Sequence, residues 1–191
     1  MGFLDSLLGR SKPVKANLDD LFALPTAALT LQASMGLTPT GEGAVCFKAA
    51  EGGAFATMQA EAQQLLAADG GPAQQVQDSY GYTWLVCKHD PEDMAGLVTE
   101  LHAINSSLEG AGFGQALLCS VVGFTGTIDG SDRTVGLVYL YKRGTFYPFA
   151  PLPGQKRDNA LELQLRGVIG ADLKIEPDLS RWFPVWGAPG L

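Results

Sequence analysis

The clearest pattern of hydrophobic positions lies between residues 117 and 151. Apolar runs there are separated by short breaks at Asp129-Gly130 and at Lys142 to Gly144. Runs of about four to eight residues rich in Val, Leu, Tyr and Phe, bounded by Gly, Asp or Pro, are typical of strands. The Asp-Gly break favours a hairpin. The pattern therefore predicts the centre of a β-sheet, with strands at Leu117–Phe124, Val135–Tyr141 and Thr145–Phe149.

Shorter signals elsewhere predict further elements. Helical spacing of apolar residues predicts a helix from Pro91, capped by Asp90, to a stop at Gly110. A last helix is expected after Arg157-Asp-Asn159. The remaining expected helices cover residues 17–24, 26–35 and 54–68, and the remaining strands cover residues 44–48, 74–78 and 82–88.

The order of these elements predicts one α+β domain, with a mostly antiparallel sheet and helices packed on one face. We expect a core domain at residues 17–175, an N-terminal arm at residues 1–16 and a Pro/Trp-rich tail at residues 176–191. The architecture is similar to that of secretion chaperones, an analogy that carries little functional weight. If the analogy holds, the other sheet face or a sheet edge would bind a partner segment or a second copy of the chain.

Composition limits the functions that the protein could have. The chain has 191 residues, 46% of them apolar, and a net charge of -7. An acidic chain disfavours general nucleic-acid binding, which needs a basic face. No apolar run approaches the ~20 residues that span a bilayer, and no signal peptide is recognisable. The three cysteines, Cys46, Cys87 and Cys119, lie in expected strands, so we interpret them as reduced core residues of a cytosolic protein.

The N-terminal arm has an amphipathic pattern that predicts a short helix. Lys12 and Lys15 flank Pro13, which would end that helix. Such a segment could dock on an anionic membrane, though weakly, or in a groove of a partner. It could equally fold back onto the body of the protein. Its apolar stripe consists of Phe3, Leu4, Leu7 and Leu8.

The sequence contains few candidates for catalysis. His89 stands before an expected helix start and beside Asp90, where a general base could be held, although a surface residue at a strand end fits the same pattern. His102 and the scattered thiols lack the close spacing of zinc ligands. There is no G-x-S-x-G, P-loop or G-x-G-x-x-G motif. We therefore predict no catalytic residues, no cofactor and no metal site.

Two features suggest contacts with a partner. Lys142 and Arg143 form a basic spot beside aromatic residues, which could receive an acidic partner or lipid headgroups, or could be a solvated hairpin turn. In the tail, Trp182 and Trp186 would form an interaction motif if they were exposed. We expect them instead to pack on the sheet, because a free tail with this much apolar surface would aggregate.

Four segments of the chain are recognisable, at residues 1–10, 138–149, 157–162 and 181–191. They resemble the PspAB family, the PspA-associated proteins of actinobacteria and related bacteria. The resemblance covers essentially the whole chain, and its two aromatic blocks are the most specific parts. It implies a cytoplasmic accessory protein of the phage-shock envelope-stress system, encoded near PspA-type membrane-remodelling proteins and often near a membrane zinc metalloprotease. It implies no catalytic residues.

We therefore predict a non-enzymatic adaptor or regulatory protein that acts through protein contacts near the cytoplasmic face of the membrane. The expected partner is a PspA-type protein or the zinc metalloprotease, or a second copy of the chain in a homodimer. The first alternative is a chaperone-like module that binds extended client segments. The second is a small-molecule enzyme with a cleft near His89.

Overall fold

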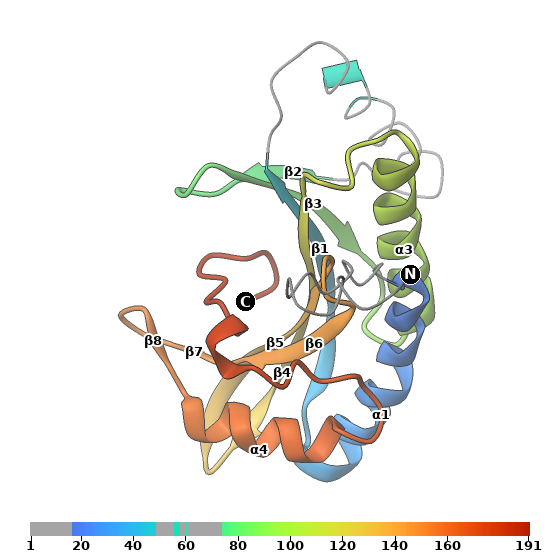
Figure 1. The fold of residues 1–191 in the computed structure, drawn as a ribbon. Helices are drawn as coiled ribbons and strands as arrows, with labels where there is room; N and C mark the ends of the chain where they lie inside the picture. The colour runs from blue at the N-terminus through green and yellow to red at the C-terminus, as the bar shows by residue number, and fades with distance from the viewer. Residues whose placement is uncertain (1–16, 49–55, 58–59, 61–73) are drawn as a thin grey trace, which may run out of the picture.

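The computed structural model describes residues 17–48, 56–57, 60 and 74–191. It shows one α+β domain built on a six-stranded antiparallel sheet with the strand order β2-β3-β1-β4-β5-β6 (Figure 1). The predicted fold class is thus confirmed. The expected arm at residues 1–16 and most of the expected helix at 54–68 lie outside the described residues. The strands are β1 (Thr38–Lys48), β2 (Gln74–Gln77), β3 (Tyr82–Lys88), β4 (Leu117–Ile128), β5 (Ser131–Leu140) and β6 (Thr145–Phe149).

The β4–β5 hairpin turns at Asp129-Gly130, as the sequence predicts. Both residues have positive φ, 50° and 74°, and Ile128 pairs with Ser131 across the turn. This backbone is typical of a two-residue turn whose twist matches that of the flanking strands. The turn therefore sets the register of β4 and β5.

Strand β1 is longer than the predicted segment 44–48. Pro39, Gly41 and Gly43 weaken the local strand signal, yet the strand begins at Thr38. A Cβ at Gly43 would lie 3.1 Å from a Leu101 methyl group of the helix above it. The glycine thus permits close packing of helix on sheet, a reason that the local sequence does not reveal.

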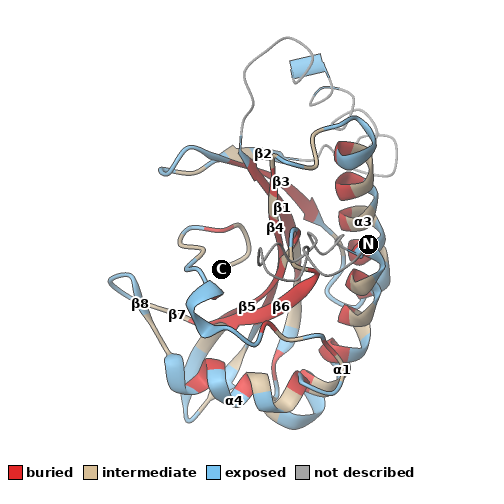
Figure 2. Cartoon of the chain, in the orientation of Figure 1, coloured by how far each residue is buried: buried red, intermediate tan, exposed pale blue. Residues whose placement is uncertain are grey.

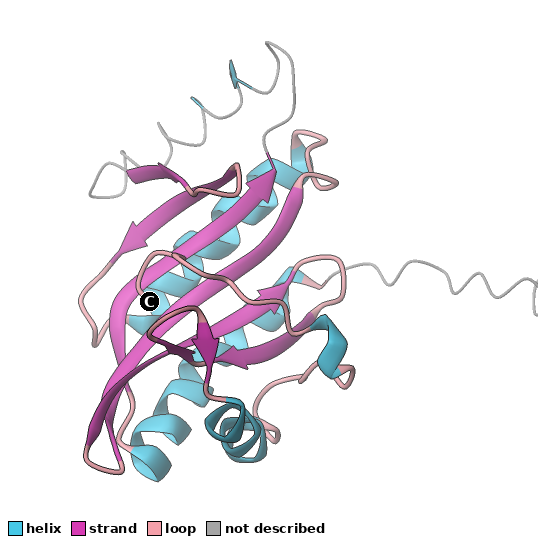
Figure 3. Cartoon of the chain, turned by 90° about the vertical axis from the view of Figure 1, so that its left-hand side faces the viewer, coloured by secondary structure: helices cyan, strands magenta, loops and turns pink. Residues whose placement is uncertain are grey.

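The helices line one face of the sheet (Figures 1 and 3). They are η1 (Leu18–Ala23), α1 (Leu24–Met35), α3 (Met94–Gly110) and α4 (Asn159–Ile169). Their apolar sides and the strands beneath form the larger core, which Figure 2 shows as buried. Fully buried members of this core include Leu31, Leu97, Leu101, Phe124, Val135, Leu165 and Ile169.

The predicted start of α3 is wrong by three residues. Asp93 caps the helix, and its carboxylate accepts a hydrogen bond from the Gly96 amide at 2.9 Å. Asp90 instead begins a turn, accepting from the Glu92 amide with its side chain and from the Asp93 amide with its carbonyl. Two aspartates within one turn both satisfy the cap pattern, and the structure uses the second one.

The opposite face of the sheet carries a second, smaller core. The C-terminal segment comprises residues 176–191. Figures 1 and 3 show it crossing this face, away from α3. Two short strands, β7 (Pro151–Leu152) and β8 (Lys156–Arg157), form a separate hairpin, and η2 (Leu179–Arg181) lies within the C-terminal segment. The second core consists of Ala44, Cys46, Trp84, Val86, Cys119, Val121, Val138, Tyr147, Phe149, Trp182 and Ala188.

Candidate functional site

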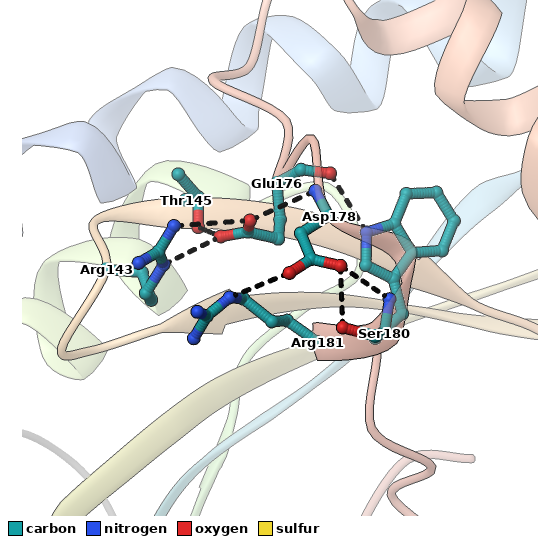
Figure 4. Close-up of polar contacts among 7 residues, drawn as sticks. Arg143, Thr145, Glu176, Asp178, Ser180 and Arg181 are labelled. Carbon is teal, nitrogen blue, oxygen red and sulfur yellow. Dashed lines mark hydrogen bonds and ion pairs between the residues drawn. The ribbon is translucent and has the colours of Figure 1, made fainter.

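A buried carboxylate anchors the C-terminal segment to the edge of the sheet. Glu176 is fully buried, and its carboxylate accepts hydrogen bonds from Arg143 Nε at 3.0 Å and from Thr145 Oγ1 at 2.7 Å (Figure 4). The Asp178 amide donates a third bond at 3.2 Å. Burial alone would raise the pKa of this carboxyl, but these hydrogen bonds hold the pKa below its usual value. The carboxylate is therefore charged at neutral pH.

The backbone on both sides of Glu176 extends the sheet edge. The Phe146 amide donates to the Lys174 carbonyl at 2.8 Å, and the Glu176 amide donates to the Phe146 carbonyl at 2.7 Å. Ile175 forms a parallel bridge with Phe146. The outer edge of β6 is thus already paired.

Beyond Glu176, aromatic and cationic side chains fix the segment on the sheet. Trp182 is buried, stacks on Tyr147 with ring centroids 5.9 Å apart, and donates from its indole to the Glu176 carbonyl at 3.0 Å. The Tyr147 hydroxyl donates to the Phe183 carbonyl at 2.7 Å. Arg157 donates to the Trp182 carbonyl. The carbonyls of Glu176, Trp182 and Phe183 are therefore each held by a side-chain donor.

The end of the chain lies directly on two paired glycines of the central strands. A Cβ at Gly123 would stand 2.5 Å from the Gly190 carbonyl oxygen, and a Cβ at Gly136 would stand 3.0 Å from a Leu191 methyl group. Because real Cβ atoms essentially never lie within 2.5 Å of a backbone oxygen, only glycine at position 123 lets the terminus pack here, and a larger residue at position 136 would have to displace the Leu191 side chain. Trp186 is half-buried nearby and packs edge-on against Phe149.

This anchored segment presents apolar side chains to solvent. Leu179 is 50% exposed and Phe183 is 59% exposed, although the backbone that carries them is fixed. The guanidinium groups of Arg143 and Arg181 lie on one side of the Glu176 and Asp178 carboxylates (Figure 4). We refer to Lys142, Arg143, Leu179, Arg181 and Phe183 as the C-terminal surface.

The charge balance differs along the chain. Residues 142–191 carry seven basic and five acidic residues, whereas residues 1–141 carry six basic and fifteen acidic residues. Residues 142–191, which include the C-terminal surface, thus carry a small net positive charge in an acidic protein. Such an arrangement favours association with acidic partners.

A second polar cluster surrounds His89. Its ring nitrogens lie 3.0 Å from an Asp93 carboxylate oxygen and 2.8 Å from a Glu100 carboxylate oxygen. Burial alone would lower the pKa of this imidazole, but the bonds to Asp93 and Glu100 raise it above its usual value. With both nitrogens bonded to carboxylates, the ring links the end of β3 to α3. Within the described part of the chain, no group of three or more potential ligands could hold a metal ion.

The structure separates the residues that the sequence analysis singled out. Trp182 is buried in the second core, and Trp186 is half-buried. Lys142 is exposed in the β5–β6 turn, beside the partly exposed Arg143. The sequence analysis did not identify Leu179 as a surface residue, because an isolated leucine in a segment without helical or strand periodicity gives no sign of its exposure. The arm residues Phe3, Leu4, Leu7 and Leu8 lie outside the described residues.

Comparison with known protein families shows which family the chain belongs to. Residues 1–190 of 191 match the family model PspAB, described as PspA associated protein B. The chain belongs to the PspAB family. The resemblance noted in the sequence is thus confirmed, and the family description links the role of the chain to PspA. Neither the comparison with curated proteins nor that with solved structures gives a match. No helix among the described residues is long and apolar enough to cross a membrane.

Proposed function

We propose that this PspAB-family protein is a non-enzymatic adaptor that binds a PspA-type protein through the C-terminal surface. It acts in the cytoplasm, near the inner face of the membrane, as a regulatory component of the envelope-stress response. The arm at residues 1–16 contributes a second, weaker contact with the partner or with lipid. The domain division into arm, core at 17–175 and tail at 176–191 is part of this proposal.

The observation that carries the proposal is the exposure of Leu179 and Phe183 on a rigidly held segment. Exposed apolar side chains on mobile termini are common, but here the flanking backbone is fixed by Glu176 and Tyr147. Because this backbone is already ordered, binding through these side chains costs little further backbone entropy, so they are effective anchors in an interface. A surface of this kind favours a specific folded partner.

Charge supports the choice of an acidic partner face. Lys142 is exposed, and Arg181 is about half exposed and pairs with Asp178 only at the surface. Such rim charges raise the association rate and make affinity dependent on salt. We expect acidic residues around an apolar strip on the PspA-type partner.

The test is a binding titration of the full-length protein with the purified PspA-type protein of the same host. Phe183→Ala and Leu179→Ala should each weaken binding about tenfold, the loss of roughly 1.4 kcal/mol expected for an interface anchor. Leu163→Ala is the matched control, because Leu163 is 49% exposed on α4, which packs on the other face of the sheet. It should leave affinity within about twofold.

The outcomes distinguish the proposed site from its alternatives. Unchanged affinity in both alanine variants, with loss of binding on removal of residues 1–16, would move the site to the arm. Equal binding of unrelated extended peptides would indicate the chaperone-like module instead. A signal from vesicles with anionic lipids that disappears with residues 1–16 would assign the membrane contact to the arm.

A further inference from the structure

Two of the three cysteines face each other across neighbouring strands. Cys46 of β1 and Cys119 of β4 are direct partners in the antiparallel register, and both belong to the second core. Directly opposed residues in such a pair have Cα atoms about 4.5 or 5.5 Å apart, depending on the hydrogen-bonding position. Both separations lie within the range of about 4.4–6.8 Å that disulfides span.

Cys87 does not share this arrangement. It lies on β3 and belongs to the core on the helix side of the sheet, where it pairs in register with Gly43. Burial raises the pKa of its thiol, and Glu100 raises it further. No strand neighbour of Cys87 in the described register is a cysteine. It therefore serves as an internal control for the other two thiols.

We propose that Cys46 and Cys119 form a thiol modification site, which a low-molecular-weight disulfide oxidises to a cross-strand disulfide. The thiolate of one cysteine attacks the small disulfide, forms a mixed disulfide and releases one thiol. The second thiolate attacks the protein sulfur of that mixed disulfide and releases the other thiol. Both cysteines lose a proton, and the two electrons pass to the small disulfide, which leaves as two thiols.

The C-terminal segment controls access to this pair. Cys46 and Cys119 are 3% and 7% exposed, and they belong to the same buried cluster as Trp182 and Ala188 of that segment. The hydrogen bond between the thiols and their burial also raise the pKa of Cys46, so the folded, reduced pair reacts slowly. Reaction then requires the segment to lift from the sheet, which couples the thiols to the element that carries the C-terminal surface.

The test uses the full-length wild-type protein under native conditions. The reduced protein is equilibrated with oxidised glutathione, unfolded, treated with N-ethylmaleimide and mapped by peptide mass spectrometry. We expect a Cys46–Cys119 cross-link while Cys87 remains alkylated. Cys87→Ser should form the same cross-link. Loosening the segment with Gly123→Ala should make the reaction several times faster.

Two results would overturn the proposal. One is complete alkylation of all three cysteines after equilibration, and the other is oxidation that gives only glutathione adducts or a disulfide involving Cys87. A cross-link that forms equally fast in wild type and Gly123→Ala would remove the role of the C-terminal segment in access. Because the wild-type chain carries the main test, the result does not depend on the folding of a cysteine variant.

Discussion

Arg143 and Glu176 form an ion pair across 33 positions of sequence, with Arg143 Nε 3.0 Å from Glu176 Oε2. The carboxylate is completely buried, whereas the arginine side chain is 41% exposed. The pair therefore joins solvent-facing charge on the β5–β6 turn to a buried anchor of the C-terminal segment. A single substitution at Glu176 should therefore loosen the segment that carries the proposed binding surface.

Glu176→Ala should destabilise the protein by about 2–3 kcal/mol, because the buried Thr145 hydroxyl and Asp178 amide lose their acceptor. Chemical denaturation measures this loss. Arg181→Ala is the control: its exposed pair with Asp178 should contribute less than about 1 kcal/mol. Equal losses in the two variants would contradict the anchoring role. The Glu176 contribution is present above the usual carboxyl pKa of 4.5 and is lost as pH falls through the lowered folded-state value.

Gly123→Ala should displace the end of the chain. The new methyl group would meet the Gly190 carbonyl oxygen at 2.5 Å, and relief of this clash should cost about 1–3 kcal/mol in unfolding free energy. Gly167→Ala is the matched control in α4, where an added Cβ meets nothing within 4 Å. It should stabilise the helix by up to about 1 kcal/mol. Thermal unfolding of both variants checks the opposite signs, and a neutral Gly123→Ala would refute the close seating of the terminus.

The sequence predicts strands and sharp turns here better than it predicts how the tail is anchored. Asp129-Gly130 encodes its hairpin locally, because few other residues adopt two consecutive positive φ angles. The start of β1 was missed because its glycines are explained only by tertiary contacts: α3 packs on Gly43, and Gly41 has a positive φ and lies against His89. The α3 cap was misplaced because Asp90 and Asp93 are locally equivalent.

The site depends on contacts between distant residues. In the sequence, nothing distinguishes Glu176 from an exposed charge of the tail. Only the structure shows that its carboxylate bonds Thr145 and Arg143. In the same way, the sequence does not show that Trp182 is buried while its neighbour Phe183 is exposed. Since the segment has no helical or strand period, no local pattern distinguishes the inward from the outward aromatic residue.

Tyr147→Phe should lower stability by about 1 kcal/mol, because it removes the 2.7 Å hydrogen bond to the Phe183 carbonyl while keeping the ring. Tyr80→Phe is the control. The Tyr80 hydroxyl accepts a hydrogen bond from Gln155 at an exposed position, so its loss should have almost no effect on unfolding. The comparison uses urea denaturation, and a similar loss from both substitutions would argue against fixation of Phe183 by Tyr147.

The His89 cluster should make stability fall as pH rises above the usual histidine pKa of 6.5. Because Asp93 and Glu100 raise the pKa of the folded imidazole, the folded state binds more protons than the unfolded state in this range. The contribution is fully present below the usual histidine pKa of 6.5 and is lost as pH rises through the raised folded-state value. His89→Gln should therefore remove more stability at about pH 5.5 than at about pH 8.5.

Urea denaturation of wild type and His89→Gln at these two pH values measures the difference. His102→Gln is the control, since the His102 partner Asp19 is 77% exposed and such a pair contributes little. An equal loss from His89→Gln at both pH values would mean that the ring acts through packing and neutral hydrogen bonds. A larger loss at low pH would identify the protonated ring as the link between β3 and α3, because only the imidazolium can donate to both carboxylates at once.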